Sequence, residues 1–164
     1  MKKLETDILK IFLNHKNDKL FFIKINKILQ KYVGFKLLTF TVMHPNNKFV
    51  KRIYSSNKKK YPVGGTKKIP KNYWSEITIQ KKRSFIGNNK KQIEKYFFDH
   101  RIITSLGCES ILNQVVVFDN ETIGTINLLN KENYFKKKHL IITNMISKFL
   151  TPTYLNFQKK IRRK

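Results

Sequence analysis

Two apolar segments separated by a short turn constrain the fold of this chain more than any other feature. SILNQVVVF (110–118) and TIGTINLL (122–129) are rich in β-branched residues, and the DNE segment at 119–121 suits a hairpin turn. Because strands this close in sequence pair in antiparallel fashion, an antiparallel sheet is expected. The first strand is predicted to project Ser110, Leu112 and Gln114 to one face of the sheet, and Ile111, Asn113 and Val115 to the other.

The remaining patterns place helices at both ends of the chain and strands between them. Helices are predicted at 4–13, 19–33, 89–98 and 134–160, with short ones at 72–79 and within 99–107. Strands are predicted at 36–43, 48–55 and 84–87, a turn at 44–47 and a loop at 56–72. Pro152 is expected to kink or break the last helix.

This order of elements predicts a single α+β domain over residues 1–164 with a central antiparallel sheet. The terminal helices are expected to pack on one face of the sheet. The irregular middle segment would cover the other face, where the space beneath it is the natural place for a pocket.

The strongly basic composition has two interpretations. A net charge of +25 favours an acidic partner such as nucleic acid or an anionic membrane. However, Lys outnumbers Arg by 30 to 5 and Ala is absent, a skew that a strongly AT-rich genome would impose on any protein. Nucleic-acid surfaces more often use the planar fork of Arg. We therefore favour codon bias, and nucleic-acid binding stays the alternative.

Several features favour a cytoplasmic protein. No apolar run reaches the ~20 residues that a membrane-spanning helix needs. The basic start of the chain is interrupted by Glu5 and Asp7 and is followed by no small-residue cleavage site, which argues against a signal peptide. Cys108 is the only cysteine, so the chain has no internal disulfide.

Several short stretches, taken in order, resemble a GAF domain. The clearest are Ser105-Leu106-Gly107, SILNQVVV and IGTINLL (123–129), which resemble the two strands that end most GAF domains. RIYSS (52–56), YPVGG (61–65), Trp74 and FFDH (97–100) resemble a bacterial single-domain subgroup of GAF-like proteins. The resemblance covers nearly the whole chain.

The resemblance implies a five- or six-stranded antiparallel sheet with the first and last helices on one face and a small-molecule pocket on the other. GAF domains generally bind nucleotides, tetrapyrroles or other small metabolites, and many dimerise through their terminal helices. An apolar stripe along 141–149 fits such a dimer or the core alone.

Three departures separate the chain from particular groups of GAF domains. The Asn-Lys…Phe…Asp-Glu signature of cyclic-nucleotide binders is missing. Bilin-binding members usually have His after the attachment Cys, whereas Glu109 follows Cys108. GAF-type free-methionine sulfoxide reductases use several cysteines, and this chain has one. The sequence therefore identifies no cofactor.

The stretch FFDHRIITSLGCESILN (97–113) concentrates reactive side chains, namely Asp99, His100, Ser105, Cys108 and Glu109. Asp99 is placed to cap the turn through 100–106, and His100 suits either a ligand or a backbone carbonyl. Cys108 is better explained as a buried apolar residue than as a nucleophile. The four His residues at 15, 44, 100 and 139 show no metal-binding spacing.

Other polar and aromatic residues are candidates for the pocket. Gly64-Gly65 with Lys67 and Lys68 suits either an anion or a plain turn, the turn being favoured. Asn113, Thr125 and Asn127 interrupt apolar strands, and Asn113 is the strongest of the three. The candidate ligand-binding residues are Tyr54, Trp74, His100, Ser105, Cys108, Asn113 and Thr125.

The sequence favours a non-catalytic GAF-like sensor or regulatory domain that binds an unidentified small molecule and forms a homodimer through its terminal helices. A basic nucleic-acid-associated protein is the alternative. A small enzyme using the Asp99–Glu109 region is less favoured, because no base and nucleophile stand at a suitable spacing.

Overall fold

A computed structural model describes residues 2–14 and 18–162 and shows the predicted α+β architecture. Six strands form one sheet in the order β3-β2-β1-β6-β5-β4, and all neighbouring strands are antiparallel. The strands are β1 (Leu37–Met43), β2 (Phe49–Ser55), β3 (Thr66–Lys68), β4 (Phe85–Gly87), β5 (Ser110–Phe118) and β6 (Glu121–Asn130). Residues 15–17, which separate the first two predicted helices, lie outside the described residues.

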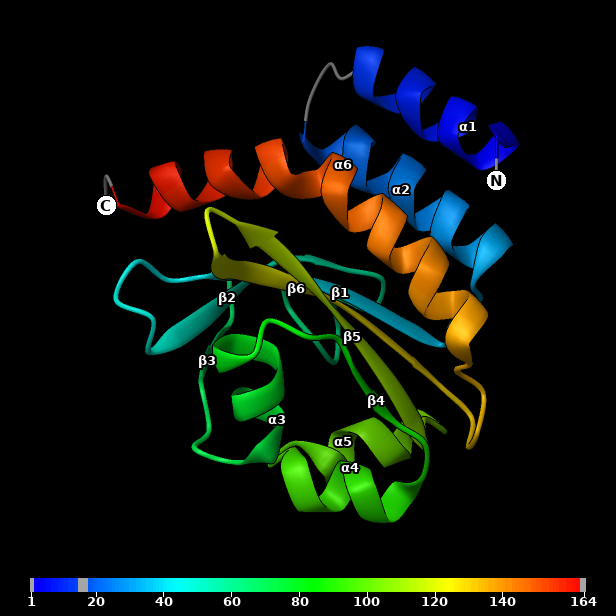
Figure 1. The fold of residues 1–164 in the computed structure, drawn as a ribbon. Helices are drawn as coiled ribbons and strands as arrows, with labels where there is room; N and C mark the ends of the chain where they lie inside the picture. Colours follow the sequence, from blue (N-terminus) through cyan, green and yellow to red (C-terminus); the bar gives the residue numbers. More distant parts are fainter. Residues whose placement is uncertain (1, 15–17, 163–164) are drawn as a thin grey trace.

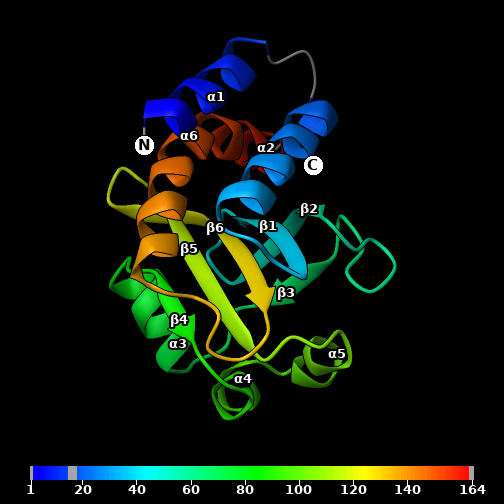
Figure 2. The same ribbon diagram turned by 90° about the vertical axis from the view of Figure 1, so that its right-hand side faces the viewer.

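Helices cover both faces of the sheet, as Figures 1 and 2 show. On one face lie α2 (Asp18–Tyr32) and α6 (Lys137–Arg162), and α1 (Lys2–Leu13) packs on the outside of these two helices. The other face is covered by α3 (Tyr73–Ser75), the π-helix η1 (Glu76–Gln80), α4 (Lys90–Tyr96) and α5 (His100–Ser105). The terminal helices therefore share one face, as predicted.

The β5–β6 hairpin confirms the strongest prediction from the sequence. Its turn consists of Asp119 and Asn120, whose φ angles of 47° and 56° are both positive. Two such residues form the turn that matches the twist of paired strands, and Asp and Asn tolerate this conformation better than other non-glycine residues. Glu121 already pairs with Phe118, so the turn is one residue shorter than expected.

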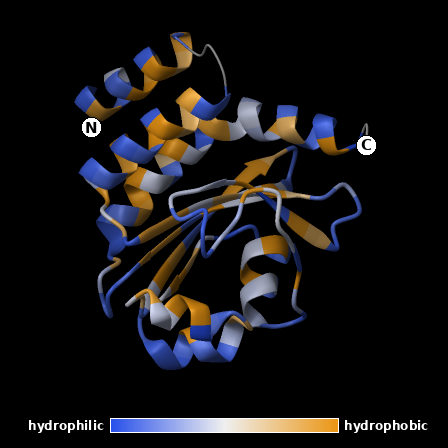
Figure 3. Ribbon diagram, turned by 180° about the vertical axis from the view of Figure 1, so that it is seen from behind, coloured by the Kyte–Doolittle hydropathy of each residue, from blue (hydrophilic) through white to orange (hydrophobic). Residues whose placement is uncertain are grey.

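The sheet separates two apolar clusters. On the side of α2 and α6, the cluster includes Phe21, Phe40, Leu112 and Tyr154, all almost fully buried. On the opposite side, a smaller cluster contains Trp74, Phe85, Phe97, Ile103 and Cys108, among others. In Figure 3 the strands between these clusters are mostly hydrophobic. Burial of β1, β5 and β6 on both faces explains why their sequences are apolar with little alternation.

The structure adds one strand to the prediction and decides between the two outcomes expected for Pro152. β3 lies inside the segment 56–72 that was predicted to be a loop. Pro152 lies inside α6 without ending it, although proline removes one helical hydrogen bond. Leu150 and Tyr154, on either side of Pro152, are 0% exposed, so packing against the sheet holds the helix together. Figure 1 shows α6 bending along its length.

The apolar stripe at 141–149 mainly contributes to the core. Ile142, Met145, Ile146 and Phe149 pack in the cluster between the sheet and the helices, whereas Ile141 is 51% exposed. The homodimer through the terminal helices stays a prediction. Among the described helices, none combines the length and the apolar character needed to cross a membrane.

Candidate functional site

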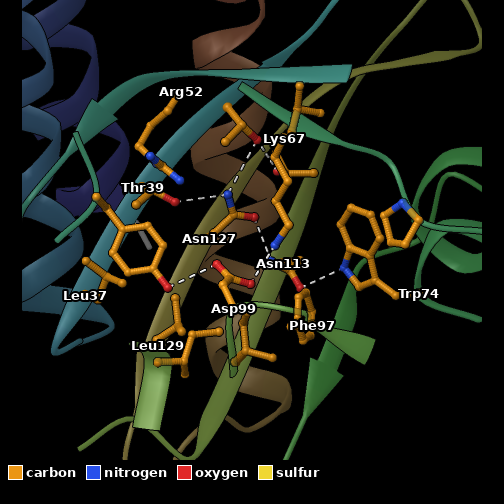
Figure 4. Close-up of a pocket in the computed structure, with 17 residues that line it drawn as sticks. Leu37, Thr39, Arg52, Lys67, Trp74, Phe97, Asp99, Asn113, Asn127 and Leu129 are labelled. Carbon is orange, nitrogen blue, oxygen red and sulfur yellow. Dashed lines mark hydrogen bonds and ion pairs between the residues drawn. The ribbon is translucent and has the colours of Figure 1, made fainter. Parts of the chain in front are cut away.

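A cavity of ≈ 70 Å³ lies between the sheet and the segment that covers its second face. The sheet supplies the floor, and the cover consists of Tyr61, Pro70, Trp74, Phe97, Asp99 and Ile103 from the segments between the strands. The cavity is lined by Leu37, Thr39, Thr41, Val50, Arg52, Tyr61, Lys67, Pro70, Trp74, Phe97, Asp99, Ile103, Ile111, Asn113, Thr125, Asn127 and Leu129. Figure 4 shows these side chains converging from the two sides.

The polar floor follows from the pairing register of the sheet. Residues directly opposite one another on neighbouring strands project to the same face. One row crosses the sheet through Thr39, Asn127 and Asn113. The adjacent row contains Arg52, Thr41 and Thr125. The register therefore brings six polar side chains together on the face of the sheet that lines the cavity.

The first row forms a chain of hydrogen bonds that runs in one direction. Trp74 Nε1 donates to Asn113 Oδ1 (2.9 Å), and Asn113 Nδ2 donates to Asn127 Oδ1 (2.6 Å). Asn127 Nδ2 in turn donates to the Thr39 hydroxyl (3.2 Å). Because Thr39 receives a bond at the end of this chain, its own proton is available to a group in the cavity.

A cluster of charged and phenolic groups adjoins this polar floor. Lys67 Nζ donates to Asp99 Oδ1 at 2.8 Å, and the Tyr61 hydroxyl donates to Asp99 Oδ2 at 3.1 Å. The Arg52 guanidinium lies over the Tyr61 ring, 4.8 Å from its centroid. Asp99 stands at the N-terminus of α5, but its side chain makes no capping bond there, contrary to the expectation from the sequence.

Arg52 is the least satisfied group of this cluster. Its Nη1 donates to the carbonyl oxygen of Pro62 at 3.0 Å, whereas its buried Nε has no hydrogen-bond partner. Burial lowers the pKa of Arg52, an effect that Tyr61 and Asp99 oppose. Burial and the nearby Asp99 carboxylate raise the pKa of Tyr61 far above its usual value. Tyr61 is therefore a neutral hydrogen-bond donor at physiological pH.

The Gly64-Gly65 turn holds Arg52 in place. Gly64 has φ 87° and donates its N–H to the Arg52 carbonyl oxygen at 2.8 Å, so that N–H is already used. A side chain on Gly65 would come within 3.0 Å of Arg52 Nη1. These glycines thus act as a turn that leaves space for the guanidinium, which agrees with the favoured interpretation of the sequence.

Three of the seven candidate residues line the cavity, namely Trp74, Asn113 and Thr125. The Thr125 hydroxyl shares a hydrogen bond of 2.7 Å with the Thr41 hydroxyl. The structure brings these three residues together from α3, β5 and β6. Their contact with a ligand stays a prediction.

Tyr54 lies on the other face of the sheet, so its proposed place in the pocket needs correction. Its ring packs against Phe22 and Phe40, with centroid distances of 5.5 Å and 5.3 Å. The cause is a β-bulge in β2, where Thr41 pairs with Arg52 but Phe40 pairs with Tyr54. The extra residue, Ile53, reverses the alternation, so Arg52 and Tyr54 point to opposite faces.

His100 and Ser105 also lie outside the cavity lining. His100 is the first residue of α5, and its backbone N–H bonds to the carbonyl oxygen of Phe97. Ser105 is exposed at the end of the same helix, where its hydroxyl donates to the Ile102 carbonyl oxygen at 2.8 Å. The helix turns both residues away, while Ile103 between them faces the cavity.

Cys108 is buried beside the cavity without lining it. Its side chain is 0% exposed and belongs to the apolar cluster with Phe97 and Ile103. Burial raises the pKa of the Cys108 thiol to about 11, although Lys36 opposes the shift. A thiol in this state is a packing residue, as the sequence suggested.

We expect Cys108 to react with a thiol reagent about one hundred times more slowly in the folded protein than in denaturant at pH 7. A pKa near 11 instead of 9 lowers the thiolate fraction by this factor, and burial slows access further. Reaction with Ellman's reagent, with and without urea, measures the ratio. Equal rates would show that the thiol is accessible and that folding does not raise its pKa.

The sequence did not identify Arg52 and Tyr61 as residues of the pocket, and it placed Asn127 below Asn113 as a candidate. Register could have identified Asn127, since a residue opposite Asn113 on the same face shares its surroundings. Asp99 was considered only as a cap or a catalytic group. Within 2–14 and 18–162, no group of three or more His, Cys, Asp or Glu side chains is arranged to hold a metal ion.

Comparisons with known proteins agree on the fold. No family model and no curated protein sequence matches the chain. Solved structures do match, including the GAF domain of a phosphoenolpyruvate-protein phosphotransferase from Coxiella burnetii. It has a TM-score of 0.77 and 10% identity, and the match covers 96% of this chain and 94% of that one.

Two further structures extend the comparison. The GAF domain of a two-component sensor histidine kinase from Bacillus halodurans has a TM-score of 0.67 and 19% identity, over 87% of this chain and 96% of that one. The type II free methionine-R-sulfoxide reductase from Thermoplasma acidophilum has a TM-score of 0.62 and 18% identity, and the match covers 80% of this chain and 87% of that one. The chain therefore has the fold of a GAF domain.

Proposed function

We propose that this chain, which has the fold of a GAF domain, is a small-molecule-binding sensor or regulatory domain that does no chemistry on its ligand. The observation that carries the proposal is the cavity between the sheet and its cover, where polar groups converge from separate elements. Ligand sites typically combine an apolar wall with a few placed polar groups. Here Phe97, Ile103 and Leu129 provide apolar surface, and Arg52 and Thr39 provide polar atoms.

The size of the cavity limits the ligand. A volume of ≈ 70 Å³ is far below the roughly 300 Å³ at which pockets for drug-sized molecules begin. A molecule with only a handful of non-hydrogen atoms fits without movement of the cover. Nucleotides and tetrapyrroles, which some GAF domains bind, are too large for this cavity.

An enzyme using the Asp99–Glu109 region has less support. Of the five reactive residues in that stretch, Asp99 alone lines the cavity. Its two carboxylate oxygens are bonded to Lys67 and Tyr61, and Cys108 is buried among apolar side chains. The similarity to a methionine sulfoxide reductase concerns the fold, and this chain has one cysteine.

Native mass spectrometry of the purified protein tests the proposal. We expect an added mass below about 150 Da that disappears under denaturing conditions, since the cavity admits only small molecules. The same spectrum reports whether the chain is a dimer. Absence of any added mass, together with no thermal stabilisation by any of a broad set of small metabolites, would contradict the proposal.

Two adjacent isoleucines on α5 provide matched variants for this test. Ile103 is 2% exposed and lines the cavity, whereas Ile102 is 42% exposed on the outside. We expect Ile103→Phe to fill the cavity and remove the added mass, and Ile102→Phe to retain it. Retention of the mass by a folded Ile103→Phe variant would place the ligand elsewhere.

A further inference from the structure

The cavity contains one more positive charge than its own side chains neutralise. Arg52 and Lys67 are the cations of its lining, and Asp99 is the carboxylate. Both oxygens of Asp99 are bonded within the cluster, one to Lys67 and the other to Tyr61. Among the described residues, no carboxylate forms an ion pair with Arg52, so the charged side chains of the lining sum to +1.

Arg52 also lacks an acceptor for one of its donors. Its Nη1 is held by the Pro62 carbonyl oxygen, but its Nε is buried and has no hydrogen-bond partner. Because Nε is closed to the cavity, a ligand would be held by the Nη groups of the guanidinium, and the site gains most from a ligand that brings acceptors and a negative charge.

The Thr39 hydroxyl is a second donor on the floor of the cavity. It accepts from Asn127 Nδ2 at the end of the chain of bonds that begins at Trp74, so its own proton is available to an acceptor in the cavity. Figure 4 shows Arg52 and Thr39 both facing the cavity. Two donors and a surplus positive charge in one small space define a site for an anion.

We infer that the ligand is a small carboxylic acid bound as its monoanion, with the carboxylate held by Arg52 and Thr39 and a short apolar body against Phe97, Ile103 and Leu129. This inference rests on the proposed function and names the chemical class of its ligand. The guanidinium edge matches the planar carboxylate, and one negative charge balances the surplus charge of the cavity.

The same features disfavour phosphate. A phosphate monoester carries about two negative charges at pH 7 and is usually cradled by several backbone N–H groups. The nearest glycine-rich turn does not offer that arrangement, because the Gly64 N–H already bonds to the Arg52 carbonyl oxygen. A zwitterionic amino acid is disfavoured as well, since its net charge of zero would leave the surplus positive charge of the lining unbalanced.

Titration calorimetry and thermal unfolding in a buffer free of carboxylates and phosphate test the inference. The probes are straight-chain carboxylates from acetate to hexanoate, the corresponding neutral amides, and inorganic phosphate. We expect at least one carboxylate to bind and to raise the unfolding temperature, while its amide and phosphate do not. Equal binding of acid and amide, tighter binding of phosphate, or no binding of any carboxylate would overturn the inference.

Charge-matched arginine variants separate the site from the general positive charge of the protein. Arg52→Gln should weaken binding of the carboxylate by about tenfold or more, since a charge-assisted hydrogen bond is lost. Arg101→Gln removes the same charge from the exposed face of α5 and should leave the affinity unchanged. Equal effects of the two substitutions would overturn the inference.

A second variant covers the case in which Arg52→Gln fails to fold. Thr39→Val keeps the shape of a side chain suited to β1 and removes one donor, so it should weaken binding of the carboxylate several-fold. A Thr39→Val variant with unaltered affinity for the acid would contradict the assignment.

Failure of the inference differs from failure of the proposed function. A neutral molecule that co-purifies with the protein would refute the carboxylate as the ligand, but it would still support a ligand site in the cavity.

Discussion

Replacement of Gly124 by alanine is expected to lower the free energy of unfolding by about 3 kcal/mol or more. Gly124 lies in β6 opposite Val42, under the C-terminal half of α6. An added Cβ would approach the Thr41 carbonyl oxygen to 2.3 Å and Tyr154 Cε1 to 2.5 Å. Tyr154 is 0% exposed and its hydroxyl bonds to the Thr125 carbonyl oxygen, so neither neighbour can move away easily.

Gly124 does not have a positive φ, so backbone conformation does not require glycine there. The requirement comes from the close approach of Thr41 and Tyr154. Gly64→Ala is the matched control. Gly64 has φ 87°, and an added Cβ there would meet nothing within 4 Å, so its substitution should cost only about 1 kcal/mol of backbone strain. Urea unfolding of the two variants measures the difference. Similar urea midpoints for the two variants would show that α6 moves at Tyr154 and so relieves the clash with the added Cβ.

The fold was predictable to the extent that local patterns determine it. The β5–β6 hairpin, the two long terminal helices and their common face all follow from apolar spacing and turn residues. β3 was missed because Thr66, Lys67 and Lys68 carry no apolar signal, and the strand exists through its pairing with β2. The sequence left open whether Pro152 kinks or breaks the last helix, and the helix continues because burial of Leu150 and Tyr154 outweighs the lost hydrogen bond.

The candidate site was predictable in part, for a related reason. Asn113 and Thr125 were identified because polar residues in apolar strands need partners, and Trp74 because an aromatic group with a polar tip suits a pocket. Arg52 could not be placed, since a bulge at Ile53 changes which face each residue of β2 occupies. Bulges depend on the neighbouring strand, and no pattern within RIYSS indicates one.

Replacement of Asn113 by valine should lower the free energy of unfolding by about 2–4 kcal/mol, even though valine favours strands and this position is 2% exposed. The side chain of Asn113 joins Trp74 to Asn127. Its removal leaves a buried indole N–H without an acceptor and Asn127 Oδ1 without a donor. Each unsatisfied group costs roughly 1–3 kcal/mol, and access of Asn127 to the cavity reduces the second penalty.

A double-mutant cycle with Trp74→Phe separates this polar effect from packing. Phenylalanine removes the indole N–H that Asn113→Val would leave unsatisfied, so the double variant should be more stable than the sum of the two single losses predicts, by about 1 kcal/mol or more. Additive losses, measured by urea unfolding of all four proteins, would mean that the bond between Trp74 and Asn113 contributes little. The cavity floor would then be held by apolar packing alone, and the direction of the hydrogen bonds that leaves the Thr39 proton free would lose its main support.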